Sequence, residues 1–364
     1  MDRFDQKEID AVVEVIKSGT LSGFYKNPLG GRKIVEFEKA FKEYHGMNHA
    51  ISVSSGTAGL HLSLLACGVQ SGDEVITTPL TFSATATSIL MCGAKPVFAD
   101  VDPRTYNIDP EKVKELITDK TQAIIPVHLL GTPVDMDGLI EVADGRIFVV
   151  EDACQALGAK YNGKLCGTIG DISIFSGQET KTLSFGGEGG MILTNNEDMA
   201  EELRLLRTHG QQYGNAPFTC YNYRLTEMQA AFGLVQLKKL DLFNKMQVKN
   251  AKILFKHLPE QIHPPYIPDY AEPTLYIIGC LADDGFPREE FVKRLTEKGV
   301  NKNLPGSTVG LGYQKAIMEL PLLKPYKRSC PIAEELVRHF IWFDTHRWLL
   351  PDEFAPIAKI IGET

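Results

Sequence analysis

HAISVSSGTAGLHLSLLACGVQSGDEVITTP, residues 49–79, holds two short apolar runs, 49–54 and 74–79, on either side of a helical segment. Both runs are too short for a helix and are rich in β-branched residues, which is typical of strands. A strand, a helix and a second strand in this order form the unit from which parallel sheets are built. This stretch therefore predicts an α/β fold.

The same alternation of strand and helix continues toward the C-terminus. Most of the further strand candidates are apolar throughout, which indicates strands that are covered on both faces. Together with the first two runs they predict a mostly parallel seven-stranded sheet. The five further candidates are residues 95–101, 122–130, 146–152, 171–176 and 190–195.

A change of pattern marks a second, smaller unit. One long helix is predicted from Thr226 to about His257, and a proline-rich passage, residues 259–273, follows it. The rest of the chain predicts a small α+β unit with a strand TLYIIGCLA and helices PREEFVKRLTEKG, PIAEELVRHF and PDEFAPIAKII. We place a large α/β domain with N-terminal helices at residues 1–245 and a small C-terminal domain at residues 246–364.

Composition excludes several classes of protein. The net charge of −8 argues against a nucleic-acid partner, and no apolar run approaches the roughly 18 residues of a membrane span. The seven cysteines are odd in number and form no C-x-x-C pair, so neither a disulfide framework nor a metal site is expected. The charged N-terminal helix pattern is not a signal peptide, and we expect a cytoplasmic protein.

The segment SSGTAG, residues 54–59, is a candidate phosphate site. It follows a predicted strand and opens a helix, so the backbone N–H groups of Gly56, Thr57 and Ala58 would point toward a ligand. An ordinary strand-to-helix turn capped by Ser or Thr would explain the same residues.

Two charged residues follow later strands of the same sheet. Asp152 ends the strand RIFVVED, where open α/β sheets bind their ligands, and a buried carboxylate there requires a cationic partner such as a pyridinium nitrogen. Lys181 lies in FSGQETKTLSFGGEGG, between Ser176 and a run of glycines, where an accessible lysine could form a Schiff base. A helix cap at Asp152 or Glu151 and a solvated loop lysine are the plain alternatives. The combination of phosphate site, buried aspartate and lysine, each after a strand, favours a cofactor site.

At these residues the sequence resembles the DegT/DnrJ/StrS family of pyridoxal-phosphate sugar aminotransferases. The likeness covers nearly the whole large domain. The segments that carry it are SVSSGTAGLHLSLLACGVQSGDEVITTPLTFSATA, GAKPVFADVDPRTYNIDP, AIIPVHLLGTPVDMD, VVEDACQALGAKYNGKLCGTIGD, GEGGMILTNN and NYRLTEMQAAFGLVQL.

The resemblance implies a fold-type-I transferase that acts as a homodimer on an amino-acid donor and a ketone acceptor. Lys181 would hold pyridoxal phosphate covalently, and Asp152 would pair with the ring nitrogen. The other cofactor contacts that it implies are Gln155 beside the phenolic oxygen, Phe82 against the ring face, and Gly56, Thr57, Ala58 and Ser176 at the phosphate.

Some residues of the family pattern keep alternative roles. Asn222 would reach the partner's site, and Arg224 is the alternative for that role. Core packing and a turn hydroxyl remain alternatives for Phe82 and Ser176. His128 and His209 also match family positions, and we expect both to be structural.

The acceptor remains open between several classes. We expect a nucleotide-linked ketosugar as the acceptor and glutamate or glutamine as the donor. A cyclitol ketone or another polyol ketone is the alternative acceptor. A sugar dehydratase would be expected to carry histidine in place of Lys181, and a regulatory protein would not need all of these residues. The sequence departs from the family pattern in the long loop SGFYKNPLGGRK, in NKNLPGSTVGLGYQKAIMELP and in FIWFDTHRWLLPDE, which we expect to border the acceptor pocket.

Overall fold

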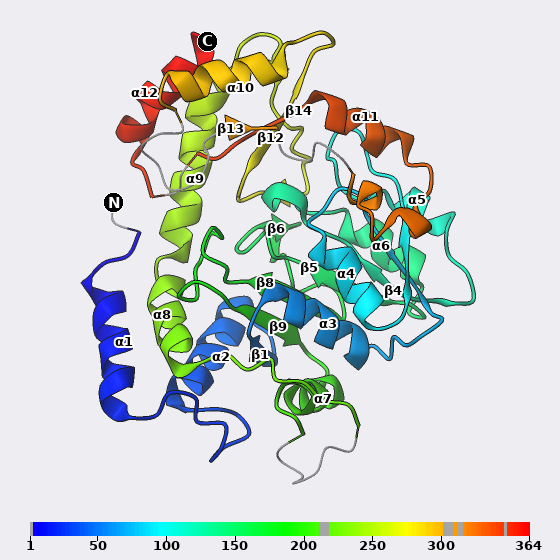
Figure 1. The fold of residues 1–364 in the computed structure, drawn as a ribbon, viewed down its shortest axis with the longest axis vertical. Helices are drawn as coiled ribbons and strands as arrows, with labels where there is room; N and C mark the ends of the chain where they lie inside the picture. The colour runs from blue at the N-terminus through cyan, green and yellow to red at the C-terminus, as the bar shows by residue number, and fades with distance from the viewer. Residues whose placement is uncertain (1–2, 211–217, 301–308, 312–315, 346–347) are drawn as a thin grey trace.

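The computed structural model describes residues 3–210, 218–300, 309–311, 316–345 and 348–364. Figure 1 shows a larger part around a central sheet, coloured blue to green, and a smaller part coloured yellow to red. Helix α9 (Leu240–Phe255) runs from one part into the other. The predicted boundary between residues 245 and 246 falls inside this helix, and the division into two domains stays a prediction.

The central sheet has seven strands in the order β1-β9-β8-β5-β4-β2-β3. Only β9 runs antiparallel to its neighbours, β1 and β8, and the other neighbouring pairs are parallel. The predicted mostly parallel seven-stranded sheet is therefore confirmed. Its strands are β1 (His49–Val53), β2 (Glu74–Thr77), β3 (Lys95–Phe98), β4 (Thr121–Ile125), β5 (Phe148–Asp152), β8 (Ile172–Ser176) and β9 (Gly190–Thr194).

Helices cover both faces of this sheet. In β8, Ile172 and Ile174 face one core cluster, while Phe175 faces the other and its ring centroid lies 5.3 Å from that of Phe41. Strands buried on both faces need apolar residues at successive positions, which explains the continuous apolar runs. The first face carries α3 (Gly56–Ala66), α4 (Ala84–Met91) and α7 (Glu197–Arg207), and the second carries α2 (Arg32–His45), α6 (Met136–Ala143) and α8 (Glu227–Leu237).

The long loop before α2 is held in place by α8. The two carboxylate oxygens of Glu227 accept hydrogen bonds from the backbone N–H groups of Lys33, at 3.0 Å, and Ile34, at 2.9 Å. Glu227 therefore caps the first turn of α2, whose own N-cap, Gly31, has no side chain. In its own chain this loop packs against α8, and it contributes no residue to the cavity described below.

The expectation of one helix from Thr226 to His257 is wrong, because α8 ends at Leu237 and α9 begins at Leu240. At the break, the N–H of Lys239 bonds to the carbonyl of Gln236 at 2.8 Å, and its ammonium lies 2.6 Å from the buried Glu8 of α1 (Gln6–Ser18). The apolar periodicity continues through the break, so the pattern alone does not reveal it.

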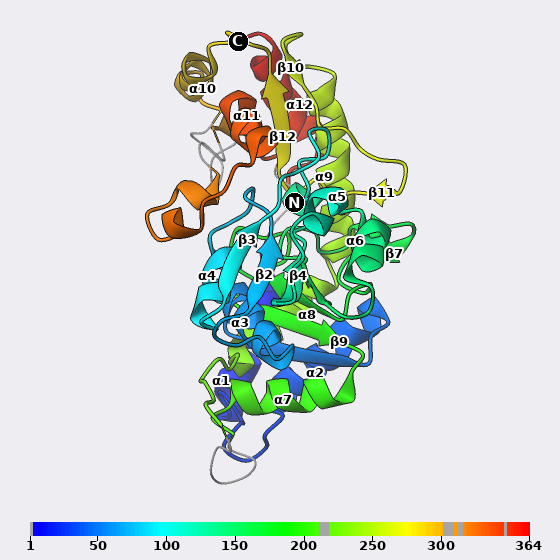
Figure 2. The same cartoon turned by 90° about the vertical axis from the view of Figure 1, so that its right-hand side faces the viewer.

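The smaller part contains a four-stranded sheet in the order β10-β12-β14-β13, and Figure 2 shows this part stacked above the main sheet. The predicted strand and three helices are present there, and β10, β13 and β14 are strands that were not predicted from the sequence. The bounds are β10 (Ile262–His263), β12 (Ile278–Ala282), β13 (Val309–Gly310), β14 (Phe340–Phe343), α10 (Arg288–Glu297), α11 (Pro331–His339) and α12 (Pro351–Gly362).

Short elements complete the described chain. A three-stranded sheet joins β11, β6 and β7. No helix among the described residues is long and apolar enough to cross a membrane. The remaining bounds are α5 (Pro110–Lys114), β6 (Lys160–Tyr161), β7 (Lys164–Leu165), β11 (Ala271–Glu272) and the 3-10 turns η1 (Leu129–Gly131), η3 (Ile317–Glu319) and η4 (Lys324–Tyr326).

Candidate active site

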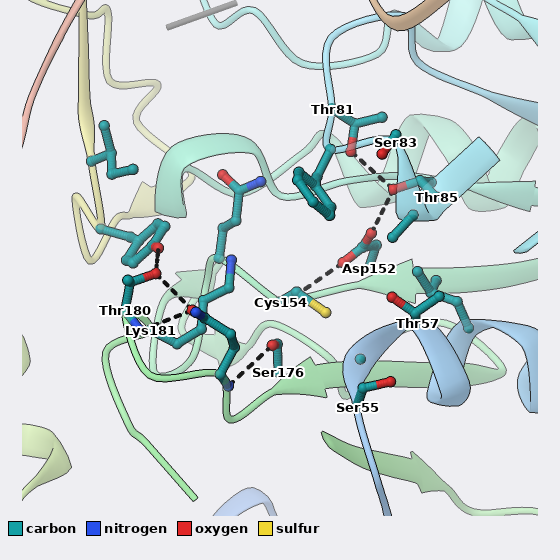
Figure 3. Close-up of a pocket in the computed structure, with 18 of the residues that line it drawn as sticks. Ser55, Thr57, Thr81, Ser83, Thr85, Asp152, Cys154, Ser176, Thr180 and Lys181 are labelled. Atoms are coloured by element: carbon teal, nitrogen blue, oxygen red, sulfur yellow. Dashed lines mark hydrogen bonds between the residues drawn. The ribbon is translucent and has the colours of Figure 1, made fainter. Parts of the chain in front are cut away.

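A cavity of about 830 Å³ lies where the carboxyl ends of β5 and β8 approach the first turn of α3. Open α/β sheets bind their ligands at this edge. Seven of the nine predicted site residues line the cavity, and Figure 3 shows the side chains around it. These seven are Gly56, Thr57, Phe82, Asp152, Gln155, Ser176 and Lys181.

The first turn of α3 forms one end of the cavity. Ser55 is its N-cap, and the Ser55 hydroxyl accepts the N–H of Ala58 at 3.0 Å. Ala58 is buried and does not line the cavity, so the N–H groups nearest to it belong to Gly56 and Thr57. A Cβ at position 56 would lie 3.1 Å from the sulfur of Cys154 and 3.2 Å from Cβ of Ser176, so the backbone approaches its neighbours closely here. This arrangement suits an anion such as a phosphate.

Asp152 is the last residue of β5 and is only 4% exposed. One carboxylate oxygen accepts from the Thr85 hydroxyl at 3.0 Å, and the other accepts from the backbone N–H of Cys154 at 3.2 Å. The Thr85 hydroxyl in turn lies 2.9 Å from that of Thr81 (Figure 3). These donors are neutral, so they fix the direction of the carboxylate and leave its charge to be balanced by a cationic ligand group.

Glu151 points to the opposite side of β5 and has a structural environment. Its carboxylate accepts from Nε2 of His128 at 2.9 Å and from three backbone N–H groups, those of Gly167, Ile169 and Gly170, at 2.6–2.7 Å. Burial alone would raise the pKa of Glu151, but these hydrogen bonds outweigh it and the pKa lies below its ordinary value. His128 accepts the N–H of Val134 at Nδ1, so both of its nitrogens serve the fold, as predicted for this residue.

Lys181 lies on a loop that folds back on itself between β8 and β9. Its N–H bonds to the Gln178 carbonyl at 2.9 Å, and the N–H of Glu179 bonds to the carbonyl of Gly187 at 2.8 Å. Gly187 has φ +115°, a backbone conformation that residues with a side chain rarely adopt. Figure 3 shows the Lys181 side chain pointing into the same space as Asp152.

Phe82 and Gln155 complete the walls. The Phe82 ring is 70% exposed although it lines a cavity, so one face is available to a flat ligand. The side-chain oxygen of Gln155 accepts the N–H of Leu130 at 2.8 Å, which leaves its amide nitrogen as the group to offer to the cavity.

Asn222 is not brought to the cavity of its own chain. It is exposed, and its side-chain oxygen accepts from Nε of Arg224 at 2.8 Å. His209 is also exposed and outside the cavity lining. Of the two C-terminal segments that were expected to border the acceptor pocket, Ile317, Leu320 and Trp342 line the cavity, whereas residues 301–308, 312–315 and 346–347 lie outside the described part of the chain.

Several residues of this site were not predicted from the sequence. Thr81 and Thr85 lie one helical turn apart in LTFSATA, and this spacing was an available signal that both hydroxyls share one side. Tyr276, which comes from the C-terminal part of the chain, was also not predicted. Because it reaches the cavity only through the packing of that part on the main sheet, no local pattern marks it.

The fold and this site define the class of a pyridoxal-phosphate-dependent transferase. The model of the DegT/DnrJ/EryC1/StrS aminotransferase family matches residues 2–361. The chain therefore belongs to this family, and the predicted family, fold and cofactor are confirmed.

Similar proteins support the same family assignment. The chain is 47% identical over 243 residues to a GDP-perosamine synthase of Caulobacter vibrioides, a match that covers 66% of this chain and 64% of that protein. The chain thus spans less than two thirds of the length of this relative.

Two solved structures of the same fold are similar over nearly their whole length. One is DesV of S. venezuelae in complex with a ketimine intermediate, with TM-score 0.89, 29% identity and coverage of 98% and 94% of the two chains. Another is the E. coli GDP-4-keto-6-deoxy-D-mannose-3-dehydratase with bound hydrated PLP, with TM-score 0.86, 26% identity and coverage of 99% and 98%.

Thr85→Val tests whether the direction of the Asp152 carboxylate matters for cofactor binding. It removes the hydroxyl that donates to Asp152 and keeps the volume, so the dissociation constant for pyridoxal phosphate should rise roughly tenfold. Absorbance titration of the cofactor-free protein measures it. Thr87→Val is the matched control, since this hydroxyl lies on the same helix and bonds only to the Ala84 carbonyl, at 3.2 Å. Equal affinities of the two variants would contradict the role of Thr85.

Proposed function

We propose that this protein transfers an amino group from glutamate or glutamine to the ketone of a nucleotide-linked sugar. The observation that carries the proposal is the shared cavity of Lys181, Asp152 and the first turn of α3. The residues fit the cofactor, because a buried carboxylate, an exposed aromatic face and a close backbone turn match a ring nitrogen, a flat ring and a phosphate. A relative named as a GDP-perosamine synthase supports a nucleotide-linked acceptor.

Bound pyridoxal phosphate would supply an electron sink for the carbanion that forms when a carbon beside nitrogen loses its proton. Asp152 would keep the ring nitrogen protonated, and Thr85 would hold Asp152 in the required direction. The Lys181 amine would take the proton from the donor's α-carbon and return it on the other side of the reaction, as general base and then general acid. Gly56, Thr57 and Ser176 would hold the phosphate, Gln155 the phenolic oxygen and Phe82 the ring face.

A dehydratase has a structural relative in its favour, the E. coli enzyme with the same fold. Lys181 argues against this reading, because such an enzyme would be expected to carry histidine at this position. The cyclitol-ketone alternative shares every residue of the cofactor site and differs only at the acceptor wall.

Reductive labelling and an acceptor panel test the proposal in sequence. Borohydride reduction of the protein with pyridoxal phosphate should remove the visible band and label the peptide that contains Lys181. The protein loaded with pyridoxamine phosphate should then regain the visible band with nucleotide-linked ketosugars and not with inososes. Labelling of another lysine would refute the site, and oxidation by an inosose alone would establish the cyclitol alternative.

We also propose that each site is completed by a second copy of the chain through Asn222. The exposed Asn222 lies outside the cavity of its own chain, and the family resemblance gives it a role at the partner's cofactor phosphate. A carboxylate in its place would then face the phosphate dianion and weaken cofactor binding by like-charge repulsion.

Mixed dimers of Lys181→Ala and Asn222→Asp test this arrangement. Each variant alone should be nearly inactive at limiting cofactor. When the two are refolded together in equal amounts, about half of the dimers should be mixed and about a quarter of all sites intact, with parent affinity for the cofactor. If mixed dimers form without recovery, Asn222 does not serve the partner, and Arg224 is the next residue for the same design.

A further inference from the structure

Tyr276 reaches the cavity from the C-terminal part of the chain, just before β12. Its ring is 6% exposed and lines the cavity. The centroid of this ring lies 4.9 Å from Nζ of Lys181, within the distance at which an ammonium interacts with an aromatic face. The Lys181 ammonium therefore lies over the face of the ring.

Three contacts hold Tyr276 and the segment that precedes it in place. The Tyr276 hydroxyl lies 3.4 Å from the hydroxyl of Thr180, the residue before Lys181. The buried side chain of Gln247, on α9, donates to the Leu275 carbonyl at 2.7 Å. The N–H of Thr274 bonds to the Gly131 carbonyl of the main domain at 3.0 Å. The ring thus has support from α9, from η1 and from the lysine loop itself.

Between these contacts the backbone turns sharply. Leu275 has φ +52°, a conformation that residues with a side chain seldom adopt. Such a conformation persists only where the surrounding structure determines it, and such sites often serve function. Here it delivers the next residue, Tyr276, to the face of Lys181.

The chemistry of the lysine explains what this face could do. In the proposed reaction, Lys181 is bonded to the cofactor for part of each cycle and is a free amine for the rest. A carboxylate beside the free ammonium would bind it strongly and oppose the loss of its proton. An aromatic face offers a weaker and less directional attraction, so it holds the ammonium near the cavity and still lets it leave.

We infer that Tyr276 is a positioning residue whose ring face holds the Lys181 ammonium whenever this lysine is not bonded to the cofactor. The inference rests on the proposed role of Lys181. It also assigns the C-terminal part of the chain a contact with the reacting group itself, in addition to its share of the acceptor wall.

Competitive chemical labelling of the cofactor-free protein tests the inference. Trace acetylation at a series of pH values, read by mass spectrometry of the Lys181 peptide, gives the pH profile of this amine. Tyr276→Leu removes the face that favours the charged form, so its profile should move by about 0.4–0.7 pH unit toward lower pH. Tyr276→Phe keeps the face and should retain the parent profile.

A buried tyrosine elsewhere supplies the matched control. Tyr161 is 4% exposed, lies outside the cavity lining, and donates its hydroxyl to Asp135 at 2.9 Å. Tyr161→Leu should lower the stability of the fold without moving the Lys181 profile. If Tyr276→Leu does not fold, Tyr276→Met should show the same shift, because methionine also fills this space without a ring.

Two results would overturn the inference. One is a Tyr276→Leu or Tyr276→Met profile that coincides with that of the parent, and the other is a Tyr276→Phe profile that moves as far as the leucine variant. Because the labelling uses protein without cofactor, it is independent of the test of the proposed function. Borohydride labelling at a lysine other than Lys181 would refute the proposed function whatever the acetylation profiles show.

Discussion

The buried carboxylate of Asp152 is the group on which the architecture of this site depends. A charge with 4% exposure is costly unless hydrogen bonds and an opposite charge compensate for it. The main chain fixes the position of the residue, because the Asp152 carbonyl accepts the N–H of His128 and the Asp152 N–H bonds to the Pro126 carbonyl, just beyond the end of β4. Thr85 and the N–H of Cys154 then fix the side chain.

Because strand β5 is pleated, its two neighbouring carboxylates lie in different surroundings. Successive side chains of a strand point to opposite faces, so Glu151 and Asp152 diverge. Glu151 has four hydrogen-bond donors and belongs to the core. Asp152 has donors that orient it without neutralising it. Burial also raises the pKa of the adjacent Cys154 thiol, with a further contribution from Asp152, so the thiol remains neutral beside the carboxylate.

Residues from distant segments meet at this carboxylate because the strands of a parallel sheet end at one edge. The order of the sequence therefore sufficed to predict that Gly56, Asp152 and Lys181 share a site, since each follows a strand of the same sheet. The strands themselves were predictable because burial on both faces requires continuous apolar runs. Asp152 was predictable for a related reason, as a charge at the end of such a run stands out.

Other features depend on contacts that the local sequence does not reveal. The break between α8 and α9 lies inside a continuous apolar period. Strand β14, FIWF, is a run of four residues that follows α11 without a loop, and its pairing with β12 and β13 is decided by the packing of the C-terminal part. Tyr276 lies far along the chain from Lys181, and a conformation of Leu275 that no propensity predicts brings the two together.

In the proposed mechanism the charge of Asp152 is essential for the chemistry and not for the fold, and a single-turnover measurement on Asp152→Asn tests this most directly. The variant should fold, bind pyridoxal phosphate and show a visible band. When it is mixed rapidly with glutamate, the band should decay at least about 100-fold more slowly than in the parent, because an amide cannot stabilise the protonated ring nitrogen. Decay at the parent rate would contradict the account.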